Sequence, residues 1–183
     1  MDRYAVFIDG GYAKKIPDQF GGKRVSYLKF SQCKEVAKGQ ERLRTYYYDC
    51  APYTSSPPTP EERTRKANFD RFVAKLDSES RFQVRLGRLA KHSNGPNPPQ
   101  FEQKMVDILL AVDLVQLSVQ HQIQRAVLLA NDSDFVPAIQ IAKNAGVVVE
   151  LYHLAYPKPH TELKCACDDC ITIDASMVND ITL

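Results

Sequence analysis

Three carboxylates follow apolar runs of the sequence, in positions that suggest metal-ion chemistry. Asp9 comes directly after the apolar run 4–8, and Asp132 and Asp134 come just after the apolar run 126–130. Runs of five apolar residues predict buried strands of a parallel sheet. Ligand sites of such sheets lie beyond the carboxyl ends of the strands. We therefore expect these carboxylates to lie together at one sheet edge, provided that the two strands are neighbours.

A fourth carboxylate, Asp107, lies in the long apolar stretch 101–120, which predicts a helix buried on several sides. Residues three apart share one helix face, so Lys104 and Asp107 point the same way. A buried carboxylate needs a partner, and clustered carboxylates repel one another. A divalent cation removes this conflict.

The expected metal is Mg²⁺ or Mn²⁺, because oxygen ligands without His or Cys favour these ions over Zn²⁺. Held by carboxylates, such ions activate water and neutralise charge on a phosphodiester. Lys104 is placed to contact a phosphate oxygen, and Ser133 and the N–H groups that open the following helix can also donate to one. Gly10, which has no side chain, lets the backbone approach whatever Asp9 holds.

Structural roles are the alternative for some of these acids. Asp and Ser are common helix caps, so one of Asp132 and Asp134 is expected to cap the next helix. Capping does not explain Asp9 after a strand together with Asp107 in an apolar helix. Asp113 is turned almost opposite to Lys104, and an ion pair or a supporting role is expected for it rather than a metal contact.

The order of elements predicts an α/β fold. Strands alternate with helices, which indicates a mostly parallel central sheet of about five or six strands with helices on both faces. At 183 residues and 44% hydrophobic content, residues 1–183 are expected to form a single domain. Strands are predicted at 3–8, 42–49, 82–89, 126–130, 147–152 and 171–173, and helices at 27–38, from 60 onward, at 101–120, up to 145, and at 161–166.

The net charge of +2 conceals an uneven distribution. Residues 1–104 hold 20 Lys and Arg against 12 Asp and Glu, whereas residues 105–183 hold 4 against 10. Such a division suits an anionic ligand that is held by one region and processed by acids in another. The helix from Pro60 has opposite charges four residues apart, as in Glu61 with Arg65, which favours an exposed helix face over a dedicated ligand surface.

Composition also limits the compartment and the partners. No apolar run approaches the ~18 residues of a membrane span, and no leader precedes the first strand, so a cytoplasmic protein without a membrane partner is expected. Five cysteines fit a reducing compartment. Cys165, Cys167 and Cys170 allow a zinc site with His160 or Cys50 as fourth ligand, but their spacing lacks two Cys-x-x-Cys pairs and favours inert core thiols.

The acidic motifs together resemble the NYN domain, a branch of the PIN-like nucleases. The resemblance rests on Phe7-Ile8-Asp9-Gly10-Gly11, on 104–113 (KMVDILLAVD), on 129–135 (LANDSDF) and on Ala145-Gly146, and it continues to Leu163 and Cys167-Asp168. It covers nearly the whole chain in the right order. The three acidic blocks together are specific, while any one of them is weak.

This resemblance implies a Rossmann-like PIN-type fold, a divalent metal and cleavage of RNA, with Asp9, Asp107, Asp132 and Asp134 as metal-binding and catalytic residues. Single-stranded RNA is the expected partner, and a homo-oligomer is left open. The sequence departs from the common family pattern at Tyr12, where a polar residue is usual, and at Asn131, where glycine is common. Both departures bear on the shape of the substrate groove, and Asn131 joins Lys104, Ser133 and Gly10 as a substrate-binding candidate.

Two other function classes remain. Some members of this family act as regulators, so a non-catalytic RNA-binding or regulatory module is the main alternative to a metal-dependent ribonuclease. An aspartyl-nucleophile phosphatase would need a second acid two residues after Asp9, where the sequence has Gly11.

Overall fold

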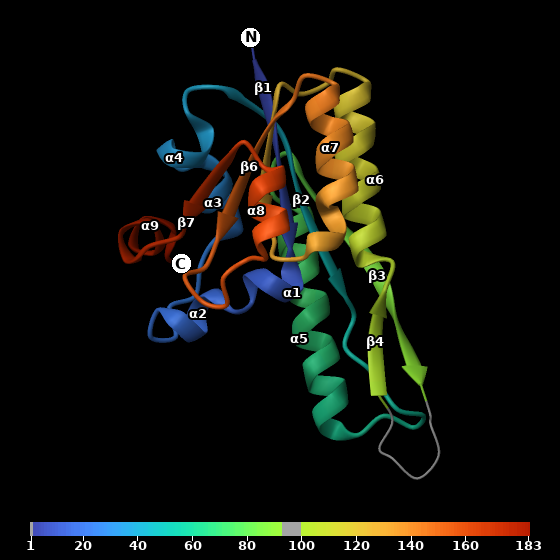
Figure 1. The fold of residues 1–183 in the computed structure, drawn as a ribbon. Coiled ribbons are helices and arrows are strands. Elements are labelled where there is room, and N and C mark those ends of the chain that lie inside the picture. The colour runs from blue at the N-terminus through green and yellow to red at the C-terminus, as the bar shows by residue number, and fades with distance from the viewer. Residues whose placement is uncertain (1, 93–99) are drawn as a thin grey trace.

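A computed structural model describes residues 2–92 and 100–183, and the side chains of residues 2–89 and 105–183. Seven strands form one sheet in the order β4-β3-β2-β1-β5-β6-β7 (Figure 1). The strands are β1 (Arg3–Asp9), β2 (Glu41–Cys50), β3 (Phe82–His92), β4 (Gln100–Lys104), β5 (Arg125–Leu129), β6 (Val148–His153) and β7 (Asp169–Thr172).

Six of the strands are parallel, and β4 joins the edge antiparallel to β3. The predicted mostly parallel α/β sheet is therefore confirmed. β1 lies beside β5, with Phe7 opposite Leu128. Strands β1 to β3 run outward on one side of this pair and β5 to β7 on the other, so the strand order reverses between β1 and β5. Ligands of open α/β sheets bind at such a reversal.

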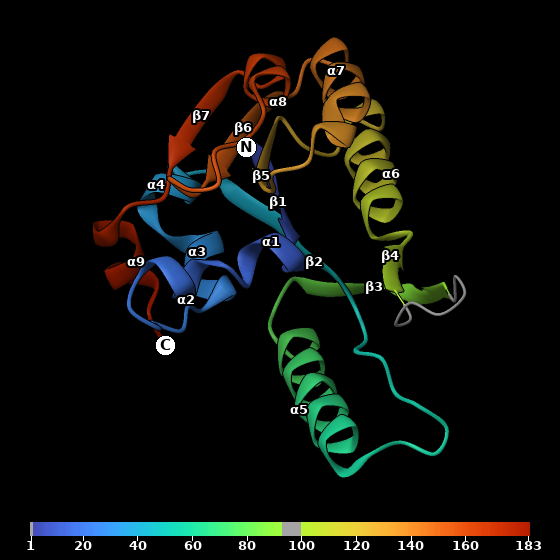
Figure 2. The ribbon, with the colours of Figure 1, turned by 60° about the horizontal axis from the view of Figure 1, so that its bottom comes forward.

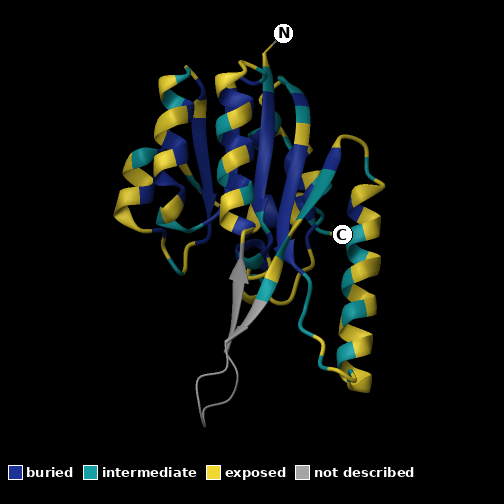
Figure 3. Cartoon of the chain, turned by 90° about the vertical axis from the view of Figure 1, so that its right-hand side faces the viewer, coloured by how far each residue is buried: buried dark blue, intermediate teal, exposed yellow. Residues whose placement is uncertain are grey.

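Helices cover both faces of the sheet (Figures 1 and 3). One face carries α6 (Val106–Val119), α7 (Val136–Asn144) and α8 (Thr161–Ala166). The other carries α1 (Gly10–Ala13), α2 (Ile16–Gln19), α3 (Tyr27–Gln32), α4 (Lys34–Ala37), α5 (Pro60–Asp77) and α9 (Ala175–Ile181).

This double cover explains the continuous apolar runs. In β1, Ala5 and Phe7 pack on one core cluster while Tyr4, Val6 and Ile8 pack on the other. All five are at most 1% exposed. A strand buried on both faces has no polar side to alternate with, so it reads as an apolar run in the sequence.

Tyr46, Tyr47 and Tyr48 of β2 are all buried for the same reason. Tyr46 and Tyr48 pack on the α6 face, and Tyr47 packs on the α3 and α5 face. The sequence left open that one of these rings could stack on bases. Their burial excludes that role.

The helix α5 begins at Pro60, as predicted, and its amino-terminal end projects away from the rest of the described chain (Figure 2). Thr59 and Glu62 form a capping box, and Glu62 also accepts from Ser55. The four-residue spacing predicts the pairs Glu61–Arg65, Glu62–Lys66 and Lys66–Asp70, and among the described side chains only the last of these forms. Glu62 is instead used by the cap, and Arg65 donates to the Tyr53 carbonyl.

The long helix predicted at 101–120 is wrong at its start. Residues Gln100–Lys104 pair with β3 as strand β4, with Lys104 opposite Arg88. Met105 then adopts a left-handed conformation (φ 76°), and α6 begins at Val106. Pairing with an exposed strand edge outweighed the local helical pattern. The expectation of burial on several sides is also wrong, because Ile108 is 63% and Val112 is 53% exposed.

Other boundaries differ at short elements. The helix predicted at 27–38 is two helices, α3 and α4, because Cys33 is extended and interrupts it. The short helices α1, α2 and α9 were not predicted, since four to seven residues give little periodic signal. No helix within residues 2–92 and 100–183 combines the length and apolar character needed to cross a membrane.

Candidate active site at the carboxyl edge of the sheet

Three of the four predicted acids line one cavity of about 480 Å³ at the point where the strand order reverses. Asp9 ends β1, Asp132 lies in the connection after β5, and Asp107 lies in the first turn of α6. The other lining residues are Gly11, Tyr12, Lys15, Asn131 and His160. Segments about a hundred residues apart in the chain therefore converge as the sequence predicted.

Asp9 is held in place by the turn that follows it. Its side chain caps α1 by accepting the backbone N–H of Tyr12 at 3.2 Å. The pKa of Asp9 is raised to about 6, mainly by burial and also by the nearby carboxylates of Asp107 and Asp49, against the lowering effect of the backbone donors. The site thus holds Asp9 rigidly but makes its charge costly.

Asp132 combines a cap with a place in the cavity. Its Oδ1 accepts the Asp134 N–H at 2.9 Å, which begins the short 3₁₀ helix η1 (Ser133–Phe135). The prediction that one of this pair caps is confirmed. Asp134 is exposed and does not line the cavity, but its charge acts on Asp107.

Asp107 is exposed at the cavity, contrary to the expectation of a buried carboxylate. Partial burial raises its pKa, and the charges of Asp132 and Asp134 raise it further. Among the described side chains no base forms an ion pair with Asp9, Asp107 or Asp132. The acids therefore repel one another across the cavity.

The donor set suits a hard cation. All three acids offer oxygen, and the Oδ1 of Asn131 is buried without a hydrogen-bond partner among the described residues. Within that part of the chain, however, no group of three or more His, Cys, Asp or Glu side chains is arranged so that it could hold a metal ion directly. Mg²⁺ usually keeps several waters and takes only one or two carboxylates, which this arrangement can supply.

The other predicted substrate-binding residues, Gly10, Ser133 and Lys104, lie outside the lining of the cavity or outside the described side chains. Gly10 is buried, and a Cβ there would lie 2.6 Å from the Tyr47 ring and 2.7 Å from the Tyr48 carbonyl oxygen. The packing against Tyr47 and Tyr48 therefore requires a residue without a side chain, and the substrate contact of Gly10 stays a prediction. The Asp134 N–H, expected to be free for a phosphate, is taken by Asp132. Ser133 is half-buried and outside the lining set, and the Lys104 side chain lies outside the described residues.

Two residues of the cavity were missed from the sequence. Lys15 lies just after α1, and His160 is the residue before α8, in the connection after β6, where its side chain makes no capping hydrogen bond. The connection after β6 leaves the same sheet edge as Asp9 and Asp132, so its position was a usable signal. His160 was considered only as a zinc ligand.

Asp113 has the structural role expected for it. Its carboxylate accepts from Arg85 at 3.2 Å and from the Tyr48 hydroxyl at 2.9 Å. The cysteines fit the expectation only in part. Cys167 is buried, which raises its pKa to about 12, but Cys165 and Cys170 are exposed rather than in the core.

The family model of the NYN domain matches residues 3–174, nearly the whole chain. The chain belongs to the NYN domain family. This confirms the resemblance drawn from the acidic motifs. NYN domains are generally nuclease-like.

Two similar proteins give context for this NYN domain. A crystal structure of a protein of unknown function from Vibrio parahaemolyticus has a TM-score of 0.64 at 16% identity and covers 100% of this chain and 96% of its own, which supports the fold. The uncharacterized protein y4oD of Sinorhizobium fredii is 46% identical over 52 residues. That match spans 28% of this chain and 24% of the relative, so the chain matches about a quarter of that protein's length.

Proposed function

We propose that this NYN domain is a metal-dependent ribonuclease that hydrolyses single-stranded RNA at the acid cavity. The observation that supports this most is the convergence of Asp9, Asp107 and Asp132 on one cavity at the strand-order reversal. Carboxylates that form no ion pair with a described base favour a polyvalent cation, and such a cation can activate water for attack on a phosphodiester.

Asp9, Asp107 and Asp132, with the Asn131 Oδ1, would hold Mg²⁺ or Mn²⁺, directly or through water. Asp134 is kept as an outer carboxylate that acts through its charge on Asp107. A bound ion of this kind supplies activated water and neutralises charge on the phosphate.

The chain's own residues supply the remaining steps. The Lys15 ammonium is available at the rim to bind a phosphate oxygen, and the His160 ring can donate a proton to the leaving oxygen. The cap of Asp9 to Tyr12 fixes the carboxylate, so that it loses little freedom when it binds a ligand. Ser133 and Lys104 stay candidates for contacts with nucleotides farther along the RNA.

Cleavage of a labelled single-stranded RNA in Mn²⁺ by Asp9→Asn tests the proposal. Asparagine keeps the cap to Tyr12 but loses the charge, so we expect the rate to fall at least about 100-fold, or about 2.7 kcal/mol in barrier, with unchanged folding. Asp18→Asn is the matched control, because Asp18 is an exposed acid of α2 outside the cavity. Undiminished cutting by Asp9→Asn would refute the assignment.

A regulatory module that binds RNA without cutting it is the second candidate. The observation that favours it is that no three acidic, His or Cys side chains of the described chain are preset as a metal site. It predicts retention of the RNA on a filter in Mg²⁺ or Mn²⁺ with no product over hours. The same assay with wild-type protein therefore separates the two candidates.

A further inference from the structure

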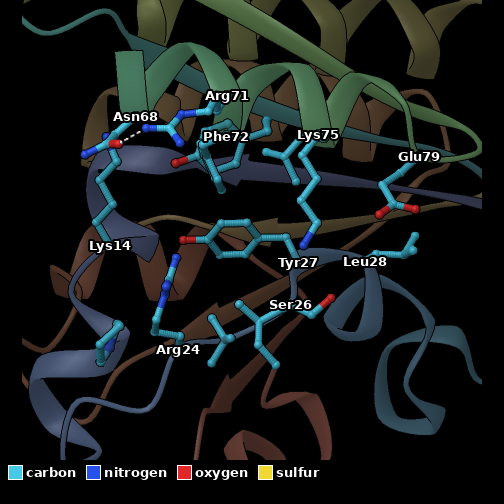
Figure 4. A pocket seen from close by; sticks show the side chains of 15 residues that line it. Lys14, Arg24, Ser26, Tyr27, Leu28, Asn68, Arg71, Phe72, Lys75 and Glu79 are labelled. Carbon is cyan, nitrogen blue, oxygen red and sulfur yellow. Dashed lines mark hydrogen bonds between the residues drawn. The ribbon is translucent and has the colours of Figure 1, made fainter. Parts of the chain in front are cut away.

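A second cavity lies on the opposite side of α1 from the acids. It is a groove of about 700 Å³ between α5 and the segment 24–28, which we name the α5 groove (Figure 4). Its walls include Lys14, Arg24, Arg71 and Lys75. Ligand sites for small molecules usually enclose ~300–1,000 Å³. The groove is large enough for a nucleotide.

The α5 groove is positively charged, and most of its cations are unpaired. Lys14 pairs with the buried Asp49 at 2.5 Å. Arg24, Arg71 and Lys75 form no ion pair with a described acid, and Glu79 is the one acidic side chain among the described residues that line the groove, which also include Leu183. Exposed basic residues that converge on a cavity without acidic partners favour an anionic ligand.

The positions of the cations suit a phosphate. Arg71 and Lys75 are four residues apart on α5 and share its inner face, while Arg24 comes from the opposite wall. Figure 4 shows Arg24 and Lys75 both extending toward Tyr27 from these two sides. Arg71 also donates to Asn68, which holds its guanidinium beside the groove. Guanidinium and ammonium groups on two walls can bind one phosphate between them.

The floor of the groove is apolar and aromatic, which distinguishes it from a site for a bare ion. Tyr27, Tyr47 and Phe72 pack together there, with ring centroids 5.1 Å apart for the two tyrosines. Val25, Leu28 and Leu76 complete this part of the lining. Tyr47 is fully buried and Tyr27 is nearly so, whereas Phe72 is half-buried, so a base would pack on Phe72 and its aliphatic neighbours while the cations hold its phosphate.

We propose that the α5 groove binds a nucleoside phosphate, with the phosphate on Arg24, Arg71 and Lys75 and the base on the aromatic floor. A free nucleotide and a terminal nucleotide of an RNA strand share this chemistry. The helix α1 separates the groove from the acid cavity: Gly11 and Tyr12 line the cavity, and Lys14 lines the groove. Binding at the groove is therefore independent of the acids and of divalent metal.

Calorimetric titration with adenosine 5′-monophosphate, in buffer with a chelator, tests the proposal. We expect binding of the nucleotide, about tenfold weaker binding of inorganic phosphate, and none of adenosine. Arg71→Glu and Lys75→Glu should each weaken nucleotide binding at least about tenfold, because each reverses a charge at the phosphate. Arg63→Glu reverses a charge of the same helix outside the groove and should change binding less than about twofold.

A competition with 5′-phosphorylated single-stranded RNA identifies the source of the ligand. Displacement of the nucleotide indicates the end of an RNA strand, whereas no displacement indicates a free nucleotide. Asp9→Asn should bind the nucleotide like wild type, so failure of the ribonuclease proposal and failure of this one can be told apart. Absence of nucleotide binding by wild-type protein, or equal binding by Lys75→Glu and Arg63→Glu, overturns the proposal.

Discussion

The sheet carries two clusters of charged groups, and they are built in opposite ways. Near the amino ends of β5 and β6, Arg125 donates to Glu150 at 2.8 Å, to Gln40 at 2.7 Å and to the Val36 carbonyl at 2.6 Å. Lys38 reaches the second Glu150 oxygen at 2.6 Å. Arg125 and Glu150 are 5% and 2% exposed, so this pair is buried, while the side chain of Lys38 is 46% exposed.

At the carboxyl edge, by contrast, three acids share a cavity with no ion pair to a described base, and burial and repulsion raise the pKa of Asp9 and of Asp107. In a charge cluster that stabilises a fold, each charge has a partner of opposite charge within the protein. In a cluster that binds a ligand, like charges lie together without such partners. The comparison supports a structural role for Arg125 and Glu150, and it is one reason why we propose a ligand-binding role for the acids.

Removing one partner of the paired cluster should have the largest effect on stability. Arg125→Met leaves Glu150 buried with only Lys38 as partner, and we expect a loss of about 3–5 kcal/mol in the free energy of unfolding. Urea unfolding at pH 7 measures it. Lys66→Met breaks the exposed pair with Asp70 and should cost less than about 1 kcal/mol. Equal losses in the two variants would contradict a structural role that depends on burial.

The raised pKa of Asp9 should make the stability of the folded protein decrease as the pH rises. The folded pKa of Asp9 is about 6, above its ordinary value of 3.8, so the folded protein holds a proton that the unfolded chain has lost. This contribution to stability is present below about pH 4 and is lost as the pH rises through about 6. With a chelator present, wild type should lose about 2 kcal/mol more than Asp9→Asn between pH 4 and pH 7.

If the free energy of unfolding changed with pH equally in wild type and Asp9→Asn, the charged Asp9 carboxylate would not be destabilised in the folded protein. The comparison between variants is needed because other acids titrate in the opposite sense. Hydrogen bonds from Ser55 and Thr59 hold the pKa of Glu62 at about 2, and backbone and Lys143 hydrogen bonds lower that of Asp168. Both groups lose their contribution as the pH falls, and both are the same in the two proteins.

The acid cavity was largely predictable from the sequence, because its determinants are local. The runs 4–8 and 126–130 are apolar since both faces of those strands are covered, and each delivers its acid at its carboxyl end. Once the two strands were assumed to be neighbours, the convergence of Asp9 and Asp132 followed from sheet geometry.

What was missed depends on contacts that no local pattern encodes. Gln100–Lys104 became a strand because β3 offered a free edge, although the residues suit a helix. The α5 groove forms because the tertiary structure brings Arg71 and Lys75 of α5 opposite Arg24, which is far from them in the sequence. The charge pattern of α5 was interpreted as an exposed face, which fits Lys66 and Asp70 but not the inner side of that helix.

Asn131→Ala should have the smallest effect on stability, and it tests directly whether the carboxyl edge of the sheet binds a metal ion. Its Oδ1 is buried and unpaired in the described structure, so Asn131→Ala removes no internal hydrogen bond there and should change the metal-free stability by less than about 0.5 kcal/mol. A divalent ion at tenfold its Kd should stabilise wild type by about 1.4 kcal/mol, and we expect Asn131→Ala to lose at least half of this gain. Thermal unfolding in chelator and in Mn²⁺ measures both quantities, and Asn179→Ala, at an exposed residue of α9 outside the cavity lining, is the control for the response to Mn²⁺. A large metal-free loss with an intact response to Mn²⁺ would make Asn131 a structural residue and limit the proposed ligands to the carboxylates.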